Sequence, residues 1–202
     1  MHTAIASLEA QGYAVDLIDL YGRRWDPVLR REEFAPFEGA FKPQREQVRA
    51  IANGTLAREV RGDLDAVLRA DLLVLSFPLW WFSMPAILKG WLDRVFVMGG
   101  VAGADAGLFE TAALAGRRAV VLVTTGGGAD AFTSSGTFGG IDDFLFHIHR
   151  GVLEFVGYDA LRPIVSYGPA HLDDGERAAE LHEVRASFDS IDARPFAASS
   201  RR

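Results

Sequence analysis

"LLVLSFPLWWFSMPAILKGWLDRVF", residues 72–96, joins an almost continuously apolar run to a proline, three neighbouring aromatic residues and a periodic stretch. The run from Leu72 to Phe77 is typical of a strand buried on both faces, as in a parallel sheet covered by helices. From Pro85 to Val97 the apolar residues recur at helical spacing, and Pro85 suits a first helical turn, where its missing N–H is not needed. The stretch therefore predicts a strand, an aromatic loop and a helix.

The rest of the chain repeats this alternation of strands and helices. Further strands are expected at 14–20, 119–123 and 161–167, and helices at 3–11, 56–70, 144–156 and 174–191. The stretch 21–53 has no clean period and is interpreted as a long, partly helical excursion. Strands that alternate with helices imply right-handed crossovers and a doubly wound parallel α/β sheet. We predict that residues 1–202 form a single domain.

Composition excludes several classes of function. The chain has 21 Lys and Arg against 27 Asp and Glu, a net charge of −6, so nothing supports electrostatic binding of nucleic acid. It has no cysteine, which excludes disulfides, thiol catalysis and cysteine-ligated metals and fits a reducing cytoplasm. We expect no metal site and, without an apolar run of about 20 residues, no membrane insertion.

Two strand exits carry unusual residues. In an open parallel sheet, ligands bind beyond the carboxyl ends of the strands. One exit reads Pro78-Leu79-Trp80-Trp81-Phe82 and the other Thr124-Thr125-Gly126-Gly127-Gly128. Taken alone, the glycines are most simply an ordinary turn and the aromatics core or subunit contact. At one edge of one sheet, they predict a flat slot with hydrogen-bond donors on one side.

These motifs resemble the NAD(P)H:quinone oxidoreductase family, which are flavoproteins with a flavodoxin-like fold. The resemblance is carried by "FPLWWFSMPAILKGWLDRVF" and "VTTGGGADAF", followed in order by "LFHIHRGVLEFVGYDALRPIVSYG". "DLYGRRWDPVLRREEF" is similar to the family's segment after its second strand. The similarity extends from about Gly12 to about Ser190, which is most of the chain.

The resemblance implies an oxidoreductase that takes hydride from NADH or NADPH onto a bound FAD or FMN. It then passes two electrons to a quinone or another flat acceptor in the same slot. It also implies a homodimer, because the family's flavin slot is shared between subunits. The residues implied to contact the flavin are Pro78, Leu79, Trp80, Trp81, Phe82, Thr124, Thr125, Gly126 and Gly127.

The sequence departs from the family where a Tyr and a His are proposed to relay charge. In "ADAFTSSGTFGG" the matching positions are Phe132 and Phe138, and neither side chain can donate a hydrogen bond or take a proton. The catalytic residues therefore stay unassigned, with hydroxyl groups at Ser134, Ser135 and Thr137 as candidate substitutes. His147 and His149 are two residues apart on one expected helix, so they face different directions; we predict a structural role for both.

A second departure concerns the family's first strand and its phosphate-binding loop. Residues 1–4 already correspond to the helix that follows that loop, so we expect the natural protein to start upstream. Without a central first strand, the strands at 14–20 and 72–77 would each lose a ladder partner. The alternative is that these two strands pair directly.

Two other functions stay open at this point. One is a non-catalytic regulatory or ancillary subunit with weakened or lost flavin binding, as some relatives of the family are. The other is a structural homodimer without a ligand. A yellow colour in the purified protein would separate the ligand-free form from the others, and NAD(P)H oxidation with a quinone would separate the enzyme from the regulatory subunit.

Overall fold

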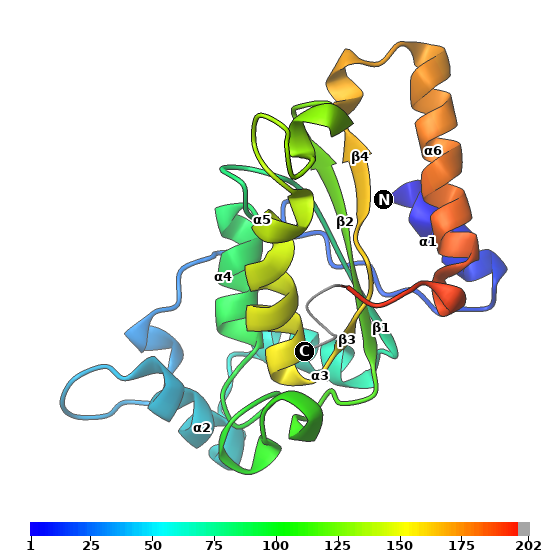
Figure 1. Cartoon of the computed structure of the whole chain (residues 1–202). Coiled ribbons are helices and arrows are strands. Elements are labelled where there is room, and N and C mark those ends of the chain that lie inside the picture. Colours follow the sequence, from blue (N-terminus) through cyan, green and yellow to red (C-terminus); the bar gives the residue numbers. More distant parts are fainter. Residues whose placement is uncertain (198–202) are drawn as a thin grey trace.

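The computed structural model describes residues 1–197, in which helices alternate with short parallel strands (Figure 1). The strands are β1 (Leu72–Pro78), β2 (Arg118–Thr125), β3 (Asp159–Ala160) and β4 (Ile164–Tyr167). The α-helices are α1 (His2–Ala10), α2 (Pro43–Asn53), α3 (Arg58–Arg69), α4 (Ala86–Val95), α5 (Ile141–Ile148) and α6 (Asp174–Asp189). Shorter helical turns are η1 (Arg31–Glu33), η2 (Ala104–Ala106), η3 (Phe109–Thr111), η4 (Ala129–Phe132), η5 (His149–Leu153), η6 (Glu154–Val156), η7 (Pro169–His171) and η8 (Ile191–Ala193).

The sheet is parallel throughout, which confirms the predicted α/β class. β1 pairs with β2 from Leu72 opposite Arg118 to Pro78 opposite Thr124. The far side of β2 pairs first with β3 and then with β4, where Thr125 lies opposite Tyr167. Of the strand expected at 161–167, only Ile164–Tyr167 (β4) forms a strand, and β3 precedes the expected span. The Leu161 N–H still donates to the Ala119 carbonyl oxygen of β2 at 2.8 Å, but Pro163, just before β4, has no N–H to donate.

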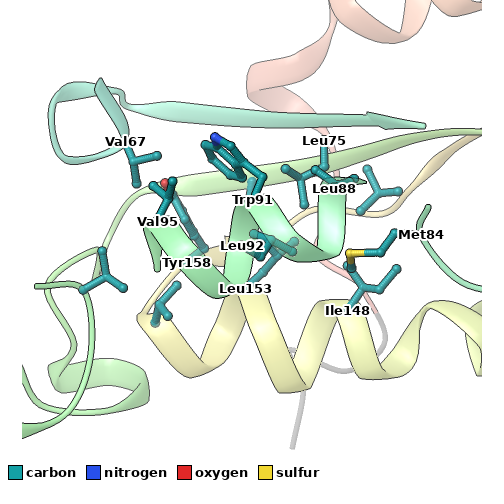
Figure 2. Packing of buried hydrophobic residues seen from close by; sticks show 14 of the residues in the cluster. Val67, Leu75, Met84, Leu88, Trp91, Leu92, Val95, Ile148, Leu153 and Tyr158 are labelled. Carbon is teal, nitrogen blue, oxygen red and sulfur yellow. The ribbon is translucent and has the colours of Figure 1, made fainter. Parts of the chain in front are cut away.

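Helices α3, α4 and α5 cover one face of the sheet, and their apolar sides meet in the larger hydrophobic core (Figures 1 and 2). Trp91 and Leu92 of α4 lie between the strands and Ile148 of α5 (Figure 2). Trp91 is 3% exposed, and its indole N–H donates to Asp63 Oδ2 of α3 at 2.8 Å. The helical spacing seen in the sequence therefore marks the buried side of α4.

Helices α1 and α6 cover the opposite face (Figure 1). A smaller core there joins Leu8 of α1 and Phe188 of α6 to Val120 and Leu122 of β2. Ser7 Oγ donates to Asp189 Oδ1 at 2.5 Å, so the two helices are also joined by a polar contact. Helices on both faces make the sheet doubly wound, as predicted.

The prediction of a strand at 14–20 is wrong. These residues form no regular element, because no neighbouring segment in the described chain pairs with them, and the alternation of apolar residues alone is not enough to make a strand. Tyr13 and Val15 still pack against the smaller core, and Ile18 and Leu20 against the larger one. The alternative of direct pairing with 72–77 is wrong as well, because β1 pairs with β2 alone within residues 1–197.

The excursion at 21–53 is partly helical, as expected, and is fastened to α4. The guanidinium of Arg94 is 4% exposed and donates to the Asp26 carbonyl at 2.7 Å and to Glu33 Oε2 at 2.9 Å. A Cβ at Gly90 would lie 2.2 Å from the Pro27 carbonyl oxygen, so only glycine allows this approach.

The helix expected at 144–156 is not one regular α-helix. α5 already begins at Ile141 after Gly140, with Asp142 and Asp143 favourably placed in its first turn. After Ile148 the chain continues as a π-helical turn (η5) and then a 3₁₀ turn (η6). Sequence periodicity alone does not distinguish these tighter and wider turns from an α-helix.

Candidate functional site

The register of β1 and β2 brings the two unusual strand exits together. Pro78 lies opposite Thr124 at the carboxyl edge of the sheet. Beyond it, the Leu79 N–H donates to the Thr124 carbonyl oxygen at 2.8 Å. The aromatic and glycine-rich segments therefore leave the sheet side by side, as the sequence predicted.

Residues 80–83 form a tight turn, here called the aromatic turn. The Trp80 N–H donates to the Ser83 carbonyl at 2.9 Å, and the Ser83 N–H donates back to the Trp80 carbonyl at 3.0 Å. Trp81 and Phe82 have φ angles of 50° and 58°, the left-handed pair of a type I′ turn. For residues with a Cβ each such conformation costs about 1–3 kcal/mol, and strain of this kind concentrates at functional sites.

The aromatic turn presents rings and unused donors to solvent. Trp81 is 96% exposed and Trp80 54%, so neither ring is a core residue in this chain. The N–H groups of Trp81 and Phe82 donate to no acceptor among residues 1–197. Flat apolar faces beside free N–H groups match the binding requirements of a planar heteroaromatic ligand.

The other wall is the glycine turn, residues 124–128. Thr125 is 5% exposed and its hydroxyl donates to the Gly127 carbonyl at 2.7 Å, while its own carbonyl accepts from the Gly168 N–H at 3.1 Å. A Cβ at Gly126 or Gly128 would meet nothing within 4 Å, but one at Gly127 would lie 3.2 Å from Phe138 and 3.3 Å from Phe132. Glycine at 127 therefore allows the aromatic rings to approach the backbone.

An aromatic cluster closes the space behind the two turns. Phe132 is 6% exposed, and its ring lies 5.3 Å from that of Phe138, centroid to centroid. Phe138 in turn lies 5.5 Å from Phe82. Phe132 and Phe138 stand where the quinone oxidoreductase family carries Tyr and His. Both therefore belong to an apolar ring cluster, and neither side chain can form a hydrogen bond.

Sequence reasoning missed Tyr167, which joins this cluster at the end of β4. Its ring lies 5.9 Å from Phe132. Burial, and to a smaller extent the charge of Asp142, raises the pKa of the Tyr167 phenol. The available signal was its place at the carboxyl end of a strand, because such residues converge at this edge of the sheet.

The two neighbouring histidines do not form a relay. His149 is 2% exposed, its Nε2 has no hydrogen-bond partner, and burial lowers the pKa of its imidazole. His147 is exposed and shares a 3.0 Å hydrogen bond between its Nε2 and Ser83 Oγ of the aromatic turn. A further histidine, His171, places Nε2 3.2 Å from the Gly126 carbonyl oxygen.

Neither a metal-binding cluster nor a membrane-spanning helix occurs among residues 1–197. Between residues 1 and 197, no three His, Asp or Glu side chains are arranged to hold a metal ion. Over the same range, the helices are all too short or too polar to cross a bilayer.

The parallel sheet, the helices on both faces and the two turns at its carboxyl edge define a protein with a flavodoxin-like fold. Residues 1–190 match the family Flavodoxin_2, which is described by that fold, and the chain belongs to this family. Its relatives include NAD(P)H dehydrogenase [quinone] 1 of Cavia porcellus, 34% identical over 93% of this chain and 69% of that protein. Ribosyldihydronicotinamide dehydrogenase [quinone] of Homo sapiens is also 34% identical, over 87% of this chain and 77% of that one.

A solved structure supports the same relationship. A protein of Klebsiella pneumoniae assigned as a quinone reductase superposes with a TM-score of 0.89 at 34% identity. The match covers 96% of this chain and 79% of the other. The family to which the motifs were compared is thereby confirmed.

Proposed function

We propose that this protein is a flavin-dependent NAD(P)H oxidoreductase that passes two electrons to a quinone or a similar flat acceptor. The observation that carries the proposal is the aromatic turn, whose strained backbone offers two unused N–H donors between exposed rings. The similar proteins named NAD(P)H dehydrogenase [quinone] and ribosyldihydronicotinamide dehydrogenase [quinone] support the same reaction class.

The residues at the sheet edge fit the ring system of a flavin. Trp80, Trp81 and Phe82 supply an apolar wall, and the N–H groups of Trp81 and Phe82 are free to bond acceptor atoms at a ring edge. The N–H groups of Gly126 and Gly127 also have no acceptor within residues 1–197. The proposed flavin-contacting set is Pro78, Leu79, Trp80, Trp81, Phe82, Thr124, Thr125, Gly126 and Gly127.

When bound, the flavin supplies the two-electron carrier between nicotinamide and acceptor. The chain's own part is binding, orientation and exclusion of water. Backbone N–H groups stabilise negative charge on a ring that they face, and more strongly where aromatic side chains exclude water. Phe132 and Phe138 pack in the wall of the slot, and neither side chain can donate or accept a proton in the reaction. Positioning of the reactants therefore supplies most of the rate enhancement.

We propose further that the bound flavin is FAD or FMN and that the hydride donor is NADH or NADPH. We also propose a cytoplasmic homodimer in which residues 1–202 make one domain per subunit. The almost fully exposed Trp81 supports the dimer, because a second subunit would cover it.

One observation favours a second candidate, a flavodoxin-like regulatory subunit without catalysis. Phe132 and Phe138 replace the side chains proposed to relay charge in the resembling family, and their rings pack together. This candidate predicts flavin binding, or its loss, without turnover.

The test has two stages. The purified 202-residue protein is incubated with FAD or FMN and desalted, and its visible spectrum is recorded. NADH or NADPH oxidation is then followed with a naphthoquinone acceptor. Retained flavin with quinone-dependent turnover supports the enzyme; retained flavin without turnover supports the regulatory subunit; a colourless protein contradicts the proposed flavin site.

A further inference from the structure

The aromatic turn needs support from outside itself. Its two backbone hydrogen bonds fix the ends of the turn, but the left-handed Trp81 and Phe82 keep their strain only where surrounding contacts over-determine them. Trp81 is 96% exposed and contributes almost no packing. The supporting contacts therefore fall on Phe82 and Ser83.

Both of these residues are held by one face of α5. Phe82 stacks on Phe144, with ring centroids 4.6 Å apart and planes 25° from parallel. Ser83 Oγ shares its 3.0 Å hydrogen bond with His147 Nε2. Phe144 and His147 are three residues apart, so they project from the same side of the helix. One contact orients a ring and the other anchors the last residue of the turn.

We propose that His147 is a positioning residue of the flavin site, acting through Ser83 on the aromatic turn. The proposal rests on the proposed function. Without the His147–Ser83 bond, the turn would sample conformations that lack the left-handed pair, and flavin binding would first have to order it. A site whose competent conformation is only partly populated binds its ligand more weakly by that fraction.

The alternative is that His147 is a surface histidine whose hydrogen bond to Ser83 has no role in binding. In that case loss of the bond would leave the flavin affinity nearly unchanged. The positioning role differs in predicting that Ser83 and His147 act on flavin affinity as a unit. His171 holds the carbonyl of Gly126 on the other wall, so it cannot substitute for His147 on this one.

The experiment is a double-mutant cycle with a conservative rescue. The chain, S83A, H147A, the S83A/H147A pair and H147Q are titrated with FAD and FMN, and flavin fluorescence gives each Kd. Near-ultraviolet circular dichroism of the flavin-free proteins reports the order of the aromatic turn, and thermal melting reports global stability. H182A is the control, because His182 is exposed on α6 and has no bonded partner.

Loss of one net hydrogen bond corresponds to a Kd about fivefold higher for H147A and for S83A. The double variant is expected to be no weaker than either single one, and H147Q should regain most of the affinity, since its amide reaches the same hydroxyl. H182A should bind as the unsubstituted chain does. Flavin-free H147A should show reduced near-ultraviolet ellipticity with its melting temperature nearly unchanged.

The outcomes separate the inference from the function on which it rests. If the unsubstituted chain binds flavin and H147A binds it equally well, the positioning role is overturned while the proposed function stands. Strictly additive effects in the cycle, or an H147Q as weak as H147A, overturn it too. If the unsubstituted chain binds no flavin, the proposed function is wrong and this inference falls with it.

Discussion

The two turns at the carboxyl edge of the sheet differ in how their residue types match their backbone conformations. The aromatic turn adopts left-handed backbone at Trp81 and Phe82, where glycine would be the easy residue. The glycine turn has three consecutive glycines, and none of them is in the left-handed region. At Trp81 and Phe82 large side chains are thus kept despite a strained backbone, whereas at Gly127 a side chain is excluded by the neighbouring rings although the backbone is permissive.

The largest expected effect comes from filling the space at Gly127. G127V should destabilise the fold by about 1–3 kcal/mol, because its side chain overlaps the rings of Phe132 and Phe138. Urea unfolding measures the change. G128A is the matched control, since nothing lies within 4 Å of its added Cβ and its φ of −71° suits alanine. Equal stabilities for the two variants would remove the space argument for the glycine turn.

Strain in the aromatic turn predicts that substitutions of Trp81 change the stability of the fold and its affinity for flavin in different ways. W81G should be more stable than W81A by about 1 kcal/mol, because only glycine adopts the left-handed backbone freely and the lost ring was exposed. Both variants should bind flavin about tenfold or more weakly, since one stacking ring is gone. Parallel melting and flavin titrations test this. A W81G variant no more stable than W81A would show that the turn is unstrained.

Tyr167 gives the smallest expected effect, a pH dependence on the glycine side of the site. Its raised folded-state pKa means that its contribution to stability is fully present below the unfolded pKa, near 10. The contribution is lost as the pH rises through the folded pKa, so stability falls in the alkaline range. Y167F should make that fall shallower, as measured by unfolding at a series of alkaline pH values, and an unchanged slope would contradict the burial argument.

The sequence predicted the parts of the fold that rest on local apolar pattern. β2 is buried as its apolar run predicted, α4 has the predicted helical spacing with its proline at the start, and the two strand exits lie together as the topology of parallel sheets implies. β1 forms the predicted strand, but its expected burial on both faces is wrong, because β1 lies at the edge of the sheet with residues 72–74 half-buried and Ser76 exposed. The segment at 14–20 was mistaken for a strand because alternation reports which side chains face a core. It does not report whether a hydrogen-bonding neighbour exists.

The finer features of the candidate site depend on contacts that no local pattern records. Ser83 and His147 are 64 residues apart in the chain, and Phe132 meets Tyr167 from a different strand exit. The left-handed Trp81 and Phe82 were hidden as well, because aromatic residues do not favour that backbone. Long-range packing sets all of these, so they appear only once the sheet register is known.

The hydrogen bond from the Leu79 N–H to the Thr124 carbonyl oxygen separates the position of the slot from its chemistry. Since this main-chain contact joins the two exits, the separation of the walls depends on the peptide backbone and tolerates changes of side chain. Substitution of a side chain such as Phe132 therefore leaves this main-chain link between the two walls in place. The backbone thereby fixes where the slot lies, and the surrounding side chains determine which molecules it can accept.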